Sequence, residues 1–314
     1  MNKYITIGLS ALALASCSKD AIEDGTIVSI EYFPQEEKVT PKETTPQTQT
    51  ATDTTYDLSQ FNEFINGPAI NYPVNTIGNG RTLVYQYDIF ADAGTRDWNF
   101  EPSNLHGYKV AQTFINNAIE GQYTLKQTQA PLKNIFETIA NEETLIVTAS
   151  ASRGGDDINA DWVIETTQNL VNSNALLVRS IENFGDDGET LSSGPVVERI
   201  YEMNEGLDQT LFVGVFDTKF DVALVNQQSY NSYEDEIIFV TMDRDVDGYY
   251  TTSHATPKLA AYASQLLNED PSLTPQELKE IIMSQVVTRE VRMAIDSTNG
   301  TINSEYRTIR ILEL

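Results

Sequence analysis

Residues 251–261 read TTSHATPKLAA, and no other segment of the chain is as informative. Ser253 stands directly before a helical pattern, so its hydroxyl is expected on a turn at the positive end of a helix dipole, where negative charge on oxygen is stabilised. The small residues Ala255, Ala260 and Ala261 allow that helix to pack closely beneath a sheet. A plain helix N-terminus capped by Ser and Thr is the other interpretation, and the surrounding sequence bears on the choice.

Short apolar segments alternate with helical patterns along most of the chain. The helical patterns repeat apolar residues every three to four positions, and the apolar segments have the length of buried strands. Such alternation indicates an α/β fold with a mostly parallel, doubly wound sheet and helices on both faces. In such sheets, functional groups gather at the carboxyl ends of the strands. The expected strands are residues 81–87, 145–147, 176–181, 210–215 and 236–240, and the expected helices are residues 108–119, 131–140, 162–171, 256–267 and 275–284.

The segment TTSHATPKLAA resembles the nucleophile motif of the subtilisin family, GTSxATPxxAG, with Thr251 at the position of the leading glycine. Other segments resemble the family's remaining motifs and follow its order of aspartate, histidine and serine. Residues 83–88, LVYQYD, resemble the first core strand, which ends in the triad aspartate, and residues 106–111, HGYKVA, resemble HGTHVA. The resemblance spans roughly residues 83–284 and implies a subtilisin-like fold.

The resemblance implies a serine-peptidase triad that acts on a peptide or protein substrate. Ser253 would be the nucleophile, His106 the general base and then the general acid, and Asp88 the buried carboxylate that orients the imidazole. The chain has only two histidines, so His254 is the one other imidazole. We expect His254 to be a packing residue or to face the groove.

Two further segments resemble motifs that contact the oxyanion and the substrate. Residues 180–185, SIENFG, resemble AAGNxG, which implies that Asn183 is the side-chain donor to the oxyanion. The segment SRGG resembles SLGG, an edge segment that pairs with substrate backbone. The resemblance therefore implies that Ser152, Arg153 and Gly154 bind the substrate.

Several positions differ from the family's motifs. Phe90, Glu182 and Thr251 occupy positions where glycine allows the backbone to approach closely, and Glu182 would bring negative charge near the developing oxyanion. These differences leave an alternative function open. The chain would then be a catalytically inactive subtilisin-like module that binds a peptide or protein partner at the cell surface.

The charge and the cysteine content exclude other classes of protein. Lys plus Arg total 20 against 46 for Asp plus Glu, which gives a formal net charge of −26. A field of this sign repels phosphate backbones and anionic lipid headgroups, so no nucleic acid and no electrostatically bound membrane is expected as a partner. Cys17 is the only cysteine, which excludes an intramolecular disulfide and a thiolate metal cluster.

The N-terminus resembles the signal of a bacterial lipoprotein. Residues 1–16 begin with a short positively charged segment, which is followed by an apolar segment too short to span a bilayer. They end in LAS before Cys17, which resembles a lipobox and implies that Cys17 carries the lipid. Residues 17–58 are expected to form a disordered, lipid-anchored tether, and residues 59–314 the peptidase domain. The expected location is the bacterial cell envelope, at the outer membrane, with exposure at the cell surface left open.

The implied chemistry needs no cofactor. Residues 243–248, DRDVDG, match the start of a calcium-binding loop with Asp243, Asp245 and Asp247 as ligands. The twelfth position of such a loop would be His254 rather than a bidentate glutamate. A solvated acidic turn is the other interpretation of this segment.

Overall fold

The structure is a computed structural model. It describes residues 20–23, 26–29, 74–88, 106–128, 130, 132–139, 144–150, 160–181, 200, 204–226, 230–231, 233–243, 251–296 and 302–314. Within the segment expected to be a tether, β1 (Asp20–Glu23) and β2 (Thr26–Ser29) pair as an antiparallel hairpin. The expected signal residues and most of the expected tether lie outside the described residues.

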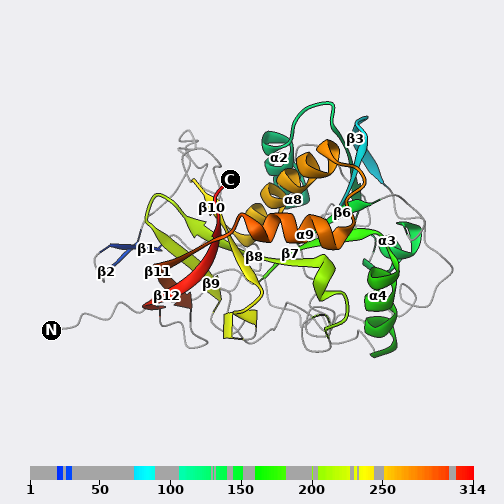
Figure 1. The fold of residues 1–314 in the computed structure, drawn as a ribbon. Coiled ribbons are helices and arrows are strands. Elements are labelled where there is room, and N and C mark those ends of the chain that lie inside the picture. The colour runs from blue at the N-terminus through cyan, green and yellow to red at the C-terminus, as the bar shows by residue number, and fades with distance from the viewer. Residues whose placement is uncertain are drawn as a thin grey trace, which may run out of the picture.

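A parallel sheet forms the centre of the protein (Figure 1). Four of its strands are buried along their whole length, because the side chains on both of their faces lie in hydrophobic cores. The parallel strands lie in the spatial order β5 (Tyr123–Thr128), β4 (Thr82–Tyr87), β6 (Leu145–Ala149), β7 (Ala175–Ser180), β8 (Thr210–Asp217) and β10 (Ile237–Met242). The expected α/β class with a mostly parallel sheet is confirmed.

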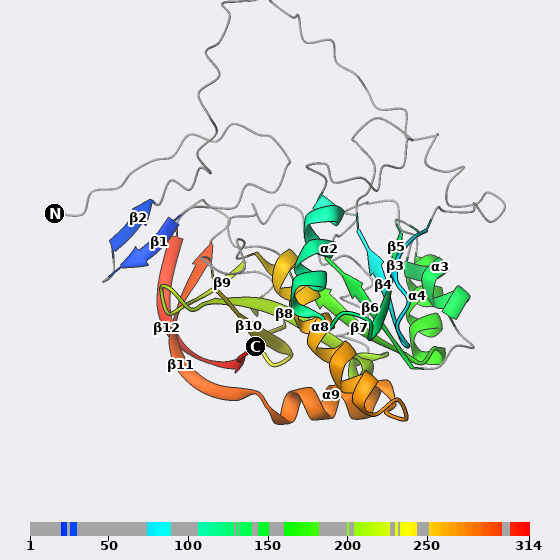
Figure 2. The same ribbon diagram turned by 90° about the horizontal axis from the view of Figure 1, so that it is seen from above.

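Helices lie on both faces of the sheet. α2 (His106–Asn117) and α8 (Thr252–Glu269) pack against each other (Figures 1 and 2), and α8 also contacts α9 (Pro275–Ser284). α3 (Leu132–Ile139) and α4 (Ala160–Asn172) pack together on the opposite face. The helices therefore enclose two separate cores.

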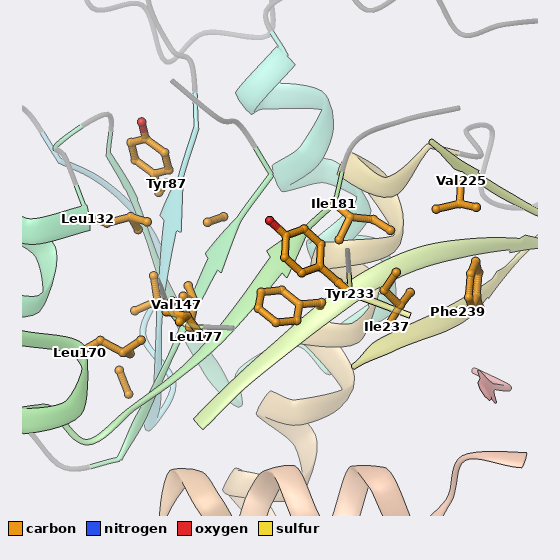
Figure 3. Packing of buried hydrophobic residues seen from close by; sticks show 14 of the residues in the cluster. Tyr87, Leu132, Val147, Leu170, Leu177, Ile181, Val225, Tyr233, Ile237 and Phe239 are labelled. Atoms are coloured by element: carbon orange, nitrogen blue, oxygen red, sulfur yellow. The ribbon is translucent and has the colours of Figure 1, made fainter. Parts of the chain in front are cut away.

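The two cores follow from the alternation of side chains along each strand. On β6, Ile146 faces the core beneath α2 and α8, whereas Val147 faces the core beneath α3 and α4. On β7, Leu176 likewise faces the core beneath α2 and α8, and Leu177 faces the core beneath α3 and α4. Figure 3 shows the core beneath α3 and α4, with Val147 beside Leu177. A strand that serves two cores is apolar throughout, which explains why these strands are readable in the sequence.

The C-terminal part of the sheet was not predicted. β11 (Val287–Asp296) and β12 (Ile302–Leu312) form a long antiparallel hairpin, which curves around one end of the sheet (Figure 2). β11 also pairs in parallel with β9 (Val222–Asn226), and β12 pairs in parallel with β10. Because β8 pairs with both β9 and β10, the five strands form a closed ring.

The remaining elements lie at the periphery of the sheet. β3 (Asn75–Gly78) pairs in antiparallel fashion with β5 at the edge of the sheet, and η1 (Leu207–Gln209) precedes β8. α9 begins with the capping box that the sequence TPQE predicts. The Glu277 N–H donates to Thr274 Oγ1 at 3.2 Å, and the Thr274 N–H donates to Glu277 Oε2 at 2.9 Å.

Gly214 permits close packing in the middle of β8. It lies opposite Phe239 of β10, and a Cβ atom at Gly214 would lie 2.9 Å from Cδ1 of that ring. We expect Gly214→Ala to lower the free energy of unfolding by about 1–3 kcal/mol, because a dense core cannot absorb the extra methyl group. Urea unfolding measures the change. In a Phe239→Leu background the cost should be smaller, and an equal cost in both backgrounds would contradict the packing argument.

Candidate active site

A carboxylate and an imidazole form the centre of the candidate site. Asp88 directly follows β4 and is fully buried. His106 is the first residue of α2, and its Nδ1 lies 2.6 Å from Asp88 Oδ1. The His106 side chain is 25% exposed, so one part of the imidazole can reach a ligand while Nδ1 contacts the buried carboxylate. The structure thus brings together two of the three predicted triad residues.

A chain of amide side chains positions the start of α2. Gln86 of β4 donates from Nε2 to the Gly107 carbonyl at 2.7 Å, which ties the end of the strand to the first turn of the helix. Gln127 Nε2 donates to Gln86 Oε1 at 3.2 Å, and Asn75 Nδ2 donates to Gln127 Oε1 at 2.6 Å. None of these three side chains was predicted from the sequence as part of the site. The available signal was a glutamine inside the otherwise apolar strand LVYQY.

The electrostatics of His106 favour its protonated form. Burial acts to lower the pKa of His106, and the charge of Lys109 acts in the same direction. The charge of Asp88 and its hydrogen bond outweigh both effects, so the pKa of His106 is raised above its ordinary value. An imidazole in this environment can accept a proton and hold it beside the carboxylate.

Ser253 lies in the first turn of α8 at the carboxyl edge of the sheet. The adjacent Thr252 donates from Oγ1 to the Ile181 carbonyl at 2.7 Å, which fixes the start of α8 to the end of β7. Ser253 is 6% exposed, and its Oγ donates to the carbonyl of Ser150, which follows β6, at 3.2 Å. Within the described part of the chain, the hydroxyl is thus bonded to Ser150 and not to His106.

His254 brings the starts of α8 and α2 together. Its ring centroid lies 6.3 Å from that of His106, with the planes at 66° in an edge-to-face arrangement. The ring is 5% exposed, and its Nδ1 lies 2.7 Å from Thr251 Oγ1. Burial lowers the pKa of His254 to about 3, and the positive charges of His106 and Lys109 add to this effect. His254 is therefore a neutral packing residue at neutral pH.

Several predicted residues lie outside the described residues: Cys17, Ser152, Arg153, Gly154, Asn183, Asp245 and Asp247. Asp243 is described and directly follows β10. Among the described residues, no group of three or more His, Cys, Asp or Glu side chains could hold a metal ion. No helix in the same set of residues is long and apolar enough to cross a bilayer.

The sequence model of the subtilase family matches residues 115–306, which is more than half of the chain. The chain belongs to the subtilase family. The matched region includes Ser253 and begins after His106, so the fit to the family is carried by the later strands and by α8. Members of this family are serine-type peptidases. No curated protein matches this subtilase.

Solved structures also resemble this subtilase. A cold-adapted subtilisin-like serine proteinase matches with a TM-score of 0.44 and 15% identity, over 74% of this chain and 89% of that one. A structure of the subtilase cytotoxin assembly matches with a TM-score of 0.45 and 14% identity, over 67% and 83%. Sphericase matches with a TM-score of 0.40 and 12% identity, over 67% and 85%.

The pair formed by Asp88 and His106 yields a prediction for proton binding. Asp88→Asn removes the negative charge, so burial acts unopposed and the pKa of His106 should fall below its value in the wild type. The chain has two histidines, and NMR titration of the imidazole signals measures the change directly. Asp217→Asn is the matched control, because Asp217 is also fully buried at a strand end but contacts the 219–220 turn. An unchanged pKa in Asp88→Asn would contradict the assignment.

Proposed function

We propose that this subtilase is an extracytoplasmic, lipid-anchored serine endopeptidase with Asp88, His106 and Ser253 as its triad. The observation that carries the proposal is the 2.6 Å contact between His106 Nδ1 and the buried Asp88 carboxylate. This contact leaves Nε2 of His106 as the basic atom. Ser253 lies on α8, which packs against the helix that begins with His106.

In the proposed reaction, the Ser253 hydroxyl leaves the Ser150 carbonyl and donates to Nε2 of His106. As Ser253 Oγ bonds to the carbonyl carbon of the substrate, its proton moves to His106. His106 then gives that proton to the departing amine as the C–N bond breaks. Water attacks the resulting ester, with His106 again taking and returning a proton, and Ser253 regains its hydroxyl.

Charge on the tetrahedral oxyanion would be met by the Asn183 amide and the Ser253 backbone N–H. The first N–H groups of a helix have no partner within the helix, so an N–H in the first turn of α8 suits this role. A peptide substrate would add as an extended strand along Ser152, Arg153 and Gly154, which follow β6 in the chain. The reaction consumes no cofactor. Calcium bound by Asp243, Asp245 and Asp247 remains a separate prediction.

A catalytically inactive binding module is the second candidate function. The observation that favours it is the hydrogen bond from Ser253 to the Ser150 carbonyl, which takes the hydroxyl away from His106. The bulky residues Phe90 and Glu182 at motif glycine positions point in the same direction. In this case the groove would hold a peptide or protein partner without cutting it.

Ser253→Ala separates the two functions. We expect cleavage of a mixed peptide library to fall by at least ~10⁴-fold, because the nucleophile is lost. A fluorophosphonate probe should label the wild type at Ser253 and leave the variant unlabelled. Ser264→Ala is the matched control, since Ser264 is also a buried serine of α8 but its Oγ donates to Ala261 of the same helix. Absence of cleavage and of labelling in the wild type would favour the binding module.

The lipid anchor has its own test. Because Cys17 is the only cysteine, Cys17→Ser removes the one possible thiol for lipid attachment. We expect the variant to lose incorporation of labelled fatty acid and to move from the membrane fraction to the soluble fraction of bacterial cells. Ser18→Ala should keep both the label and the membrane association. Label in the Cys17→Ser protein would exclude this anchor and leave the peptidase assignment untouched.

A further inference from the structure

Thr251 is the N-cap residue of α8, but its side chain does not cap the helix. Its backbone is extended, with φ −107° and ψ 158°, as expected of an N-cap, and its hydroxyl makes no capping hydrogen bond. The hydroxyl instead lies 2.7 Å from Nδ1 of His254. Thr251 stands where the family motif has glycine, which has no side chain to make this contact. The substitution therefore fixes the orientation of the imidazole that follows the candidate nucleophile.

The His254 ring packs against the candidate base. Ring centroids 6.3 Å apart with planes at 66° correspond to a stabilising edge-to-face contact between aromatic rings. His254 is 5% exposed, so it fills space beside His106 that water would otherwise occupy. Within the described part of the chain, the charged and titratable groups that act on His106 are Asp88 at the end of β4, Lys109 on α2 and His254 on α8.

We infer that His254, held by the Thr251 hydroxyl, is a positioning residue that shields one side of the His106 ring from water. The inference rests on the proposed function, because it concerns the imidazole assigned as the base. A buried aliphatic side chain would also exclude water, but it would offer no edge-to-face ring contact. A lysine would place a second positive charge beside His106 whenever His106 takes a proton. A neutral imidazole supplies the ring without that charge.

NMR titration of the full chain tests the inference without any need for turnover. The chain has only two histidines, so the two imidazole signals can be assigned by substitution. His254→Ala should admit water and relieve the burial that lowers the pKa of His106, so that this pKa rises, by roughly 0.5 or more. His254→Phe keeps an aromatic ring in place and should leave the pKa of His106 within about 0.2 of the wild-type value.

The Thr251 variants test the same inference with less disturbance of the core, in case His254→Ala does not fold. Thr251→Val should shift the pKa of His106 in the same direction as His254→Ala, whereas Thr251→Ser keeps the hydroxyl and should cause no shift. Tyr262→Phe is the control on α8, because it removes only the hydrogen bond from Tyr262 to Gln285. A merely structural role would lower stability without moving the pKa of His106.

The possible outcomes are distinguishable. Equal His106 pKa values in the wild type, His254→Ala and Thr251→Val would overturn the inference, as would an equal rise in His254→Phe. A chain that shows the predicted shifts but cleaves no peptide would retain the positioning role and lose the proposed function. A chain that cleaves peptides but shows no shift would retain the proposed function alone.

Discussion

The contact between Asp88 and His106 constrains the arrangement of the whole site. A fully buried carboxylate is costly unless a donor or a positive charge meets it, and the imidazole at 2.6 Å provides this partner. His106 can reach Asp88 only if α2 begins beside the end of β4. The bond from Gln86 to the Gly107 carbonyl holds it there. Since α2 packs on α8, the same contact constrains where Ser253 lies relative to His106.

The carboxyl edge of the sheet presents carbonyl groups to several hydroxyls. Ser150 accepts from both Ser253 and Ser180 at 3.2 Å, and Ile181 accepts from Thr252 at 2.7 Å. The Thr252 bond fixes the backbone of α8, whereas the Ser253 bond fixes only a rotatable hydroxyl group. Rotation about the Cα–Cβ bond of Ser253 therefore redirects its hydroxyl without displacing a helix or strand.

The sequence could predict the elements whose burial shows directly in their pattern of apolar residues. Strands such as residues 145–149 are apolar on both faces, and the amphipathic helices show their period directly. The hairpin of β11 and β12 was missed because charged residues such as Arg289 and Glu305 alternate with its apolar ones, which hides it among solvated segments. Its strands pair with β9 and β10, so their place depends on contacts distant in sequence.

The site was predictable only where its residues lie in recognisable sequence motifs. Order along the chain and family resemblance indicated Asp88, His106 and Ser253, and the structure brings the first two into contact. No local pattern could indicate that Thr251 would bind His254 instead of capping α8, because Ser and Thr before a helix usually cap it. The contact between the His254 and His106 rings depends on the packing of α8 against α2, which exists only in the folded chain.

The two imidazoles have opposite effects on how stability depends on pH. The raised pKa of His106 means that its pairing with Asp88 stabilises the fold fully below the ordinary histidine pKa, and that this stabilisation is lost as the pH rises through the folded value. In the folded protein His254 stays neutral down to its pKa of about 3, whereas in the unfolded chain it binds a proton at the ordinary histidine pKa. The stability of the fold therefore falls as the pH drops from the ordinary histidine pKa to about 3. Below neutrality the two contributions oppose each other. The fold can therefore hold one charged and one neutral imidazole side by side, with proton binding confined to the ring that contacts Asp88.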